Sequence, residues 1–193
     1  MAIADYFSIG ILGLIFGAQL IKRPFKLRIV RAFSLLSVII VVGVLSYLSF
    51  SQYSVWQKAG PPASYLLPPY QGIGYFLFYV FFRFWADYLI SFMAGILVFF
   101  TSRYFNKKYE ERFFYSEEYY LSATAVFLTG HPFWLIYLVL ILSFWFFVSA
   151  FRLLVLKKTE RVSFYYFWLP AAVSVILIKE LLFSWEFLRM LQL

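Results

Sequence analysis

Five charged residues interrupt the apolar stretches of this sequence, and their side chains are the ones best placed to do chemistry. Arg83 and Asp87 lie four positions apart in one apolar stretch, so they share a face if that stretch is helical. The others, Lys179, Glu180 and Glu186, lie in the last apolar stretch. An ionisable group deep in a bilayer costs about 2.5–3.5 kcal/mol, so it normally faces protein or water and has a partner. The pattern therefore indicates either a self-neutralising structural pair or a path for protons or ions.

The charged residues of the two apolar stretches are predicted to lie at similar depths in the bilayer, which suggests that they interact. Glu180 or Glu186 could approach Arg83 between packed helices, since the two stretches place these residues at similar depths. Alternatively, Lys179 and Glu180 only extend toward the outer interface, as long charged side chains do.

Cysteine is absent and histidine occurs once, at His131, which removes several kinds of chemistry. Thiol nucleophiles and disulfides are impossible, and a zinc, copper or bis-histidine haem site needs more such ligands than this sequence has. His131 lies between Gly130 and Pro132, where a neutral, hydrogen-bonded imidazole at the outer interface is the ordinary interpretation. A single axial ligand to a pigment or haem is the alternative. We otherwise expect no metal and no cofactor.

The composition places these residues in a membrane. The chain is 64% hydrophobic and 13% charged, with a mean hydropathy of +0.82, whereas a soluble domain has about 25% charged residues. Apolar stretches occupy nearly all of the 193 residues, so we expect one integral membrane domain over residues 1–193, in a multi-pass protein of the cell membrane. The net charge of +8 is better explained by topology-setting loops than by nucleic-acid binding.

Hydropathy and flanking charges predict an all-α bundle of six transmembrane helices with both termini outside. A basic cluster follows the first stretch, and cytoplasmic flanks collect such residues. The short stretch 119–129, extended by residues 113–118, counts as a crossing because otherwise a later basic cluster would face outside. The segment between the second and third spans, rich in proline and aromatic residues, is expected to be an outer loop on the interface. The predicted spans are residues 6–21, 32–50, 74–101, 113–129, 133–154 and 164–190.

A further helix is predicted at the cytoplasmic surface. Phe105, Tyr109 and Phe113 recur every fourth residue between charged residues, as in an amphipathic helix that lies in the headgroup plane. The pattern predicts such an interfacial helix over residues 103–120.

The order of these features resembles type IV prepilin peptidases, six-helix intramembrane aspartyl proteases that cleave pilin leader peptides. The segment Tyr115-Ser116-Glu117-Glu118 stands where that family has its GxGD motif, and Leu121, Ala123, Phe127 and Gly130 follow at similar spacing. The segment ending in Phe167-Trp168-Leu169-Pro170 is similar to the family's loop before the sixth helix. The resemblance covers residues 5–178.

The resemblance implies a common fold but a degenerate catalytic site. Gln19, ahead of Lys22-Arg23-Pro24, stands where the family has its first catalytic aspartate, and Glu118 stands at the second. An aspartyl protease needs two carboxyl groups that share a proton, and Gln19 cannot act as an acid or base.

We therefore expect a non-catalytic membrane protein, an accessory or structural subunit that contacts the lipid bilayer and other membrane subunits. One alternative is an active intramembrane peptidase that uses Glu118 or Glu117. The other is an ion, proton or small-solute transporter with Arg83, Asp87, Lys179 and Glu180 in the path.

Overall fold

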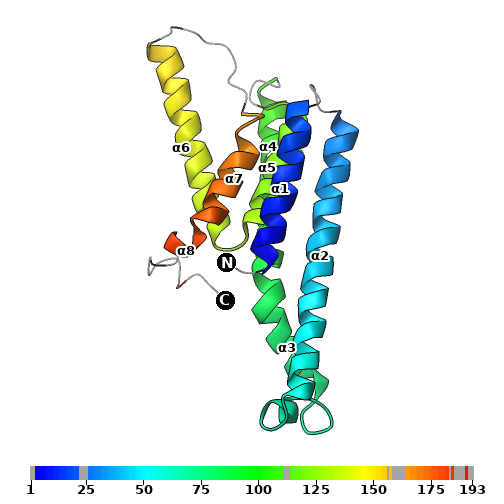
Figure 1. Ribbon diagram of the computed structural model, residues 1–193. Helices are drawn as coiled ribbons and strands as arrows, with labels where there is room; N and C mark the ends of the chain where they lie inside the picture. Colours follow the sequence, from blue (N-terminus) through cyan, green and yellow to red (C-terminus); the bar gives the residue numbers. More distant parts are fainter. Residues whose placement is uncertain are drawn as a thin grey trace.

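The computed structural model describes residues 3–21, 26–110, 114–155, 157, 164–182, 184 and 190. Within this part of the chain all regular structure is helical (Figure 1). In chain order the elements are α1 (Ile3–Ile21), α2 (Leu27–Lys58), the 3₁₀ helix η1 (Ala63–Leu66), α3 (Ile73–Val80), the π-helix η2 (Phe81–Trp85), α4 (Ala86–Lys108), α5 (Glu118–Thr129), α6 (Phe133–Leu154), α7 (Trp168–Leu177) and α8 (Lys179–Leu182).

Within the described residues, four helical segments are long and apolar enough to cross a membrane. They are Ile3–Ile21, Leu27–Lys58, the continuous Ile73–Lys108 and Phe133–Leu154. A helix needs roughly 20 residues to cross about 30 Å of hydrocarbon. Three of the segments are longer than this, and Ile3–Ile21 has 19 residues. The sequence-based prediction of an all-helical bundle is thereby confirmed. α1, the continuous segment Ile73–Lys108 and α6 lie close to the predicted spans 6–21, 74–101 and 133–154.

A short helix, α5, is the centre of the bundle. Nine of the twelve residues of α5 are buried, and α1, α2, α4, α6 and α7 all pack against it. At 1.5 Å per residue α5 measures only about 18 Å, which is less than a bilayer core. Because its neighbours shield it from lipid, α5 does not need the length of a lipid-exposed span. The ten-residue α7, with six buried residues, occupies a similar sheltered position.

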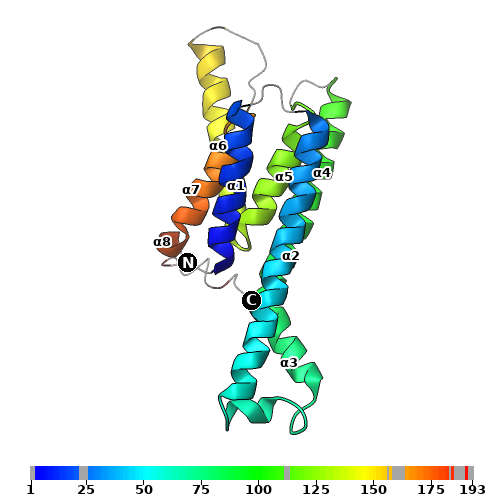
Figure 2. The same ribbon diagram turned by 45° about the vertical axis from the view of Figure 1, so that its right-hand side comes forward.

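The main helical segments, which are α1, α2, the continuous α3–η2–α4, α5, α6 and α7, alternate in direction (Figures 1 and 2). One end of the bundle, called here the basic end, contains the end of α1, the start of α2, and the ends of α4 and α6. Among the described residues, its cations are Lys26, Arg28, Arg31, Arg103, Lys107, Lys108, Arg152 and Lys157, while its acidic residues are Glu110, Glu117 and Glu118. The described basic residues toward the opposite end are Lys58, Arg83 and Lys179. Alternation in space therefore collects cations that lie far apart in the sequence.

The helix α2 ends later than the predicted span at residues 32–50. It continues eight residues past residue 50, to Lys58, because no glycine or proline interrupts it before Gly60 and Pro61. Together with η1, α3 and η2 its last part forms a helical hairpin over residues 49–85, called here the arm, which extends beyond the other helices (Figures 1 and 2). Much of the predicted outer loop is thus helical.

The arm has a small hydrophobic core of its own. Leu67, Phe76 and Val80 are buried in it, and Tyr53 and Trp56 pack against Phe76 with ring centroids 5.3 and 5.5 Å away. The arm is joined to the bundle by η2, where Trp85 Nε1 donates a hydrogen bond to Ser49 Oγ at 3.0 Å.

The predicted interfacial helix over residues 103–120 is wrong as a single element. α4 continues to Lys108 and α5 begins at Glu118, and the described residues between them form turns and loop. The reason is a clamp by the buried Asn106, whose Oδ1 accepts from the Phe114 N–H and whose Nδ2 donates to the Phe114 carbonyl, both at 2.9 Å. Nδ2 also donates to the Tyr119 hydroxyl. These bonds fold residue 114 back onto α4, which a straight helix could not do.

The last predicted span is only partly described. α7 and α8 cover residues from Trp168 to Leu182, and beyond them the structure describes Ser184 and Met190. Glu186 therefore lies outside the described residues.

Candidate functional site

A pocket lined by charged side chains lies where the arm meets the bundle. Its volume is about 520 Å³, within the range of small-molecule sites in proteins. Its walls come from the start of α1, the middle of α2, η2, the start of α4, the turn between α5 and α6, and α8. The lining residues are Ile3, Ala4, Asp5, Leu45, Leu48, Arg83, Phe84, Asp87, Tyr88, Gly130, His131, Lys179 and Glu180.

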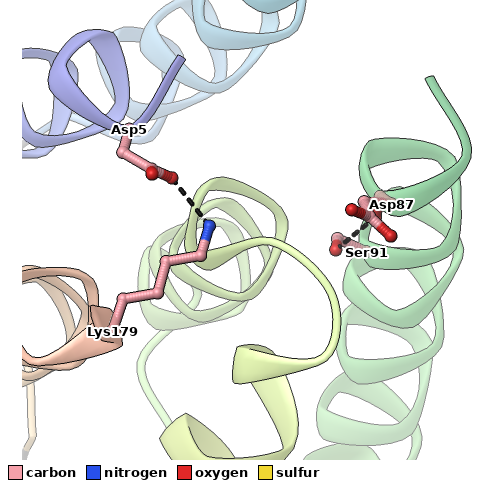
Figure 3. Close-up of polar contacts among 4 residues, drawn as sticks. All are labelled: Asp5, Asp87, Ser91 and Lys179. Atoms are coloured by element: carbon pink, nitrogen blue, oxygen red, sulfur yellow. Dashed lines mark hydrogen bonds and ion pairs between the residues drawn. The ribbon is translucent and has the colours of Figure 1, made fainter. Parts of the chain in front are cut away.

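An ion pair closes the pocket between α1 and α8. Lys179 Nζ donates to Asp5 Oδ1 at 2.8 Å (Figure 3), and the two side chains are 15% and 5% exposed. Lys179 Nζ also lies 5.0 Å from the centroid of the Phe133 ring, at cation–π distance. Burial of the two charges is costly, and their close contact offsets that cost. Removal of either side chain would therefore leave the other as an unpaired buried charge.

Gly130 lies beside this ion pair, and its backbone conformation explains why glycine occupies the position. It ends α5 at φ +79° and ψ 158°, a conformation essentially restricted to glycine. A Cβ atom at this position would lie 4.0 Å from Lys179 Nζ. The Gly130-His131-Pro132 turn thus lets the chain reverse from α5 into α6 directly beside the lysine.

Asp87 lies across from the ion pair, on α4 (Figure 3). Its Oδ1 atom is buried, and among the described residues it has no hydrogen-bond partner. The hydroxyl of Ser91 donates its hydrogen bond to the backbone carbonyl of Asp87, at 2.7 Å, and not to the carboxylate. A buried carboxylate oxygen without a partner is costly, and the side chain that carries it lines the pocket.

Arg83 comes to the pocket from η2. In this π-helix the Ala86 N–H bonds to the Phe81 carbonyl, one residue further back than in an α-helix. The extra residue shifts the side chains after it around the helix axis, and such bulges often occur at functional sites. Arg83 is exposed and lines the same pocket as Asp87 and Glu180.

His131 is half-buried in the turn between α5 and α6. Its Nδ1 atom accepts a hydrogen bond from Trp134 Nε1 at 3.2 Å. This geometry agrees with the ordinary interpretation of a hydrogen-bonded imidazole. Among the residues that the structure describes, no group of three His, Asp or Glu side chains is placed to hold a metal ion.

The structure brings together residues that the sequence suggested only separately. Four of the five charged residues picked from the apolar stretches line this one pocket, and so does His131. Asp5 and Tyr88 were missed. Asp5 was detectable as the acidic residue at the start of the first apolar stretch, but only an alternating bundle places that position beside Lys179.

The predicted peptidase positions lie at the basic end, away from this pocket. Gln19, near the end of α1, is fully buried and its Nε2 donates to the Tyr165 carbonyl at 3.3 Å. Glu118 begins α5 and is 1% exposed. Glu117 is half-buried, and its Oε2 accepts from the Ser116 hydroxyl at 3.4 Å. Gln19 thus has a structural contact, with the loop that leads into α7.

Comparisons with family models, with curated proteins and with solved structures found no match for this chain.

Proposed function

We propose that this protein is a non-enzymatic, six-pass membrane protein that binds a small zwitterionic solute in the charged pocket, as a carrier or receptor. The observation that carries the proposal is the Asp87 carboxylate, which has a buried oxygen at the pocket wall and Arg83 in the same wall. A carboxylate and a guanidinium in one pocket can hold an ammonium and a carboxylate group of one ligand.

The apolar part of the pocket suggests the rest of the ligand. Leu45, Leu48, Ile3 and Phe84 supply hydrocarbon surface between the charged groups. Most binding sites combine such surface with a few placed polar groups. A free amino acid with an apolar side chain fits this combination. We do not assign a ligand contact to Lys179, because its ammonium group already pairs with Asp5.

Orientation follows from the charge distribution. Cytoplasmic flanks of membrane proteins collect Lys and Arg, so we place the basic end in the cytoplasm and the arm outside. Six alternating passes then leave both termini outside, and the pocket lies toward the outer end of the bundle. The tyrosine and tryptophan residues of the arm, such as Tyr53 and Trp56, would lie at the outer interface, where these residue types concentrate.

Binding to the purified protein in lipid nanodiscs tests the proposal. L-leucine should raise the melting temperature, while leucinamide and 4-methylpentanoate, which each keep one of its two charges, should not. Asp87→Asn should weaken binding at least tenfold, because a charged hydrogen bond contributes about 1.5–3 kcal/mol. The matched control Glu117→Gln removes a carboxylate at the other end of the bundle and should bind normally. Equal binding of the single-charge analogues, or no binding of any apolar amino acid, would refute the proposal.

A role as accessory subunit is the second candidate, and the arm favours it. Its surface exposes Phe50, Val55, Tyr65, Tyr70, Ile73, Tyr75, Leu77, Phe78, Phe81 and Phe82, and its charged residues are Lys58 and Arg83. An apolar surface of this kind, beyond the lipid-covered bundle, suits contact with another membrane protein. Extraction in mild detergent should then co-purify partner subunits, and Phe78→Glu should release them, while a monodisperse monomer would argue against this candidate.

Kinship with prepilin peptidases remains a prediction, as does the peptidase alternative. Replacement of Glu118 by Gln tests the latter: unchanged cleavage of a leader peptide in a defined membrane assay would eliminate it.

A further inference from the structure

A second cavity lies near the basic end, between α2 and α4, and α5 forms its floor. Its volume is about 330 Å³, and its lining is almost entirely apolar. α2 packs on α5 and α4 packs on α5, but α2 and α4 are not closely packed against each other. The result is a groove along the side of the bundle. It is lined by Arg31, Ser34, Leu35, Val38, Phe92, Gly95, Ile96, Phe99, Phe100, Tyr120, Ala123, Thr124 and Phe127.

Each of the three helices presents one continuous face to the groove. On α2 the lining positions are 31, 34, 35 and 38, and α4 and α5 show the same spacing of three and four residues. Gly95 permits this arrangement, because a Cβ there would lie 2.8 Å from the Ala123 carbonyl oxygen.

The polar atoms inside the groove are already satisfied. Thr124 Oγ1 donates to Ser34 Oγ at 2.8 Å, and Ser34 Oγ donates to the Val30 carbonyl at 3.1 Å. Aromatic pairs stiffen the walls, with Phe92 and Phe127 centroids 5.6 Å apart and Phe99 and Tyr120 centroids 4.9 Å apart. A hydrocarbon chain is therefore a better occupant than water or a polar solute.

A cation lies at one end of this apolar groove. The Arg31 guanidinium carbon lies 5.3 Å from the centroid of the Tyr120 ring, which holds the charge at the groove wall. Arg103 lies on α4 one turn beyond Phe99 and Phe100, so it shares their helix face. Both arginines are exposed and belong to the basic end. From Arg31 to Val38 the groove follows α2 for seven residues, or roughly 10 Å into the apolar layer.

We propose that this groove binds one anionic glycerophospholipid, with an acyl chain between α2 and α4 and the phosphate beside Arg31 and Arg103. The combination of a dry apolar slot and a cation at its mouth matches both parts of that lipid. The bound lipid fills the space where α2 and α4 separate, and thus stabilises the attachment of α2 to the bundle.

The headgroup preference is measured first. Native mass spectrometry of the delipidated protein should show tighter binding of phosphatidylglycerol than of phosphatidylcholine with the same acyl chains. Arg31→Gln should reduce the phosphatidylglycerol affinity about fivefold, since one arginine near a lipid surface contributes about 1 kcal/mol. The control Lys58→Gln removes the same charge from the arm and should keep the preference. Equal binding of the two lipids, or equal losses in both variants, would overturn the proposal.

Occupancy of the slot is measured separately. Leu35→Trp adds a large side chain to the groove wall and should lower binding of both lipids, whereas Leu36→Trp, exposed on the same helix outside the groove, should not. Inorganic phosphate in place of lipid should leave the melting temperature unchanged. Stabilisation by phosphate alone, or identical effects of the two tryptophan variants, would show that the acyl slot is not the site.

Discussion

The Nζ atom of Lys179 lies 2.8 Å from Oδ1 of Asp5, so a largely buried ion pair joins the first helix of the described chain to α8. The two residues are 174 positions apart. Their contact closes one side of the charged pocket, and therefore couples the stability of the bundle to the shape of its candidate site.

Breaking this ion pair should destabilise the protein. Asp5→Asn leaves the Lys179 charge without its carboxylate partner, and loss of one member of a buried pair typically costs about 3–5 kcal/mol. The free energy of unfolding, measured by SDS titration in mixed micelles, should fall by that order. The double variant Asp5→Lys with Lys179→Asp should recover part of the loss, and no recovery would mean that the pair does not act as a unit.

Gly130→Ala should destabilise the turn between α5 and α6. The backbone conformation at φ +79° costs a non-glycine residue about 1–3 kcal/mol, whereas the new methyl group would lie 4.0 Å from Lys179 Nζ and cause no clash. Gly43→Ala is the matched control, because Gly43 is helical and a Cβ there would have no atom within 4 Å. Comparable unfolding free energies for the two variants would contradict the assignment of strain to position 130.

Gly95→Ala should separate α4 from α5. The added Cβ would meet the Ala123 backbone oxygen at 2.8 Å, and backbone cannot move aside as a flexible side chain can. Overpacking of this kind costs about 1–3 kcal/mol. Because Gly95 also lines the apolar groove, the same variant should bind phosphatidylglycerol less tightly. A variant as stable as the wild type would show that the two helices adjust freely.

Asn106→Ala should loosen the connection between α4 and α5. The variant deprives both the N–H and the carbonyl of Phe114 of their hydrogen bonds to the Asn106 side chain, at a cost of roughly 2–3 kcal/mol. Hydrogen exchange at the Phe114 amide should accelerate in the variant. The neighbouring exposed Lys107→Ala should change neither the exchange rate nor the unfolding free energy by much.

Local composition was sufficient to predict the helices and the class of the fold. Apolar runs such as residues 6–21 and 133–154 can satisfy their backbone groups in lipid only as helices, so α1 and α6 lie almost where expected. Residues 51–58 were misjudged, because proline pairs further along suggested a loop, although the helix-breaking signal begins only at Gly60. The interfacial helix failed because the Asn106 side chain, which no hydropathy pattern registers, bonds to backbone eight residues away.

The sequence by itself determined that the chain is helical, apolar enough for a membrane, and without the thiol and multi-histidine chemistry of many sites. It also identified the residues whose burial in a membrane is costly, since a charged residue within an apolar run is visible in the sequence alone. Only the tertiary structure decided which of them meet: Asp5, Asp87, His131 and Lys179 come from four separate segments and share a pocket. These residues come together because five helices pack around α5 and because the π-helix η2 changes which side chains of the α3–α4 segment face the pocket. The packing of helices against one another depends on several segments at once and cannot be read from the sequence of any one of them.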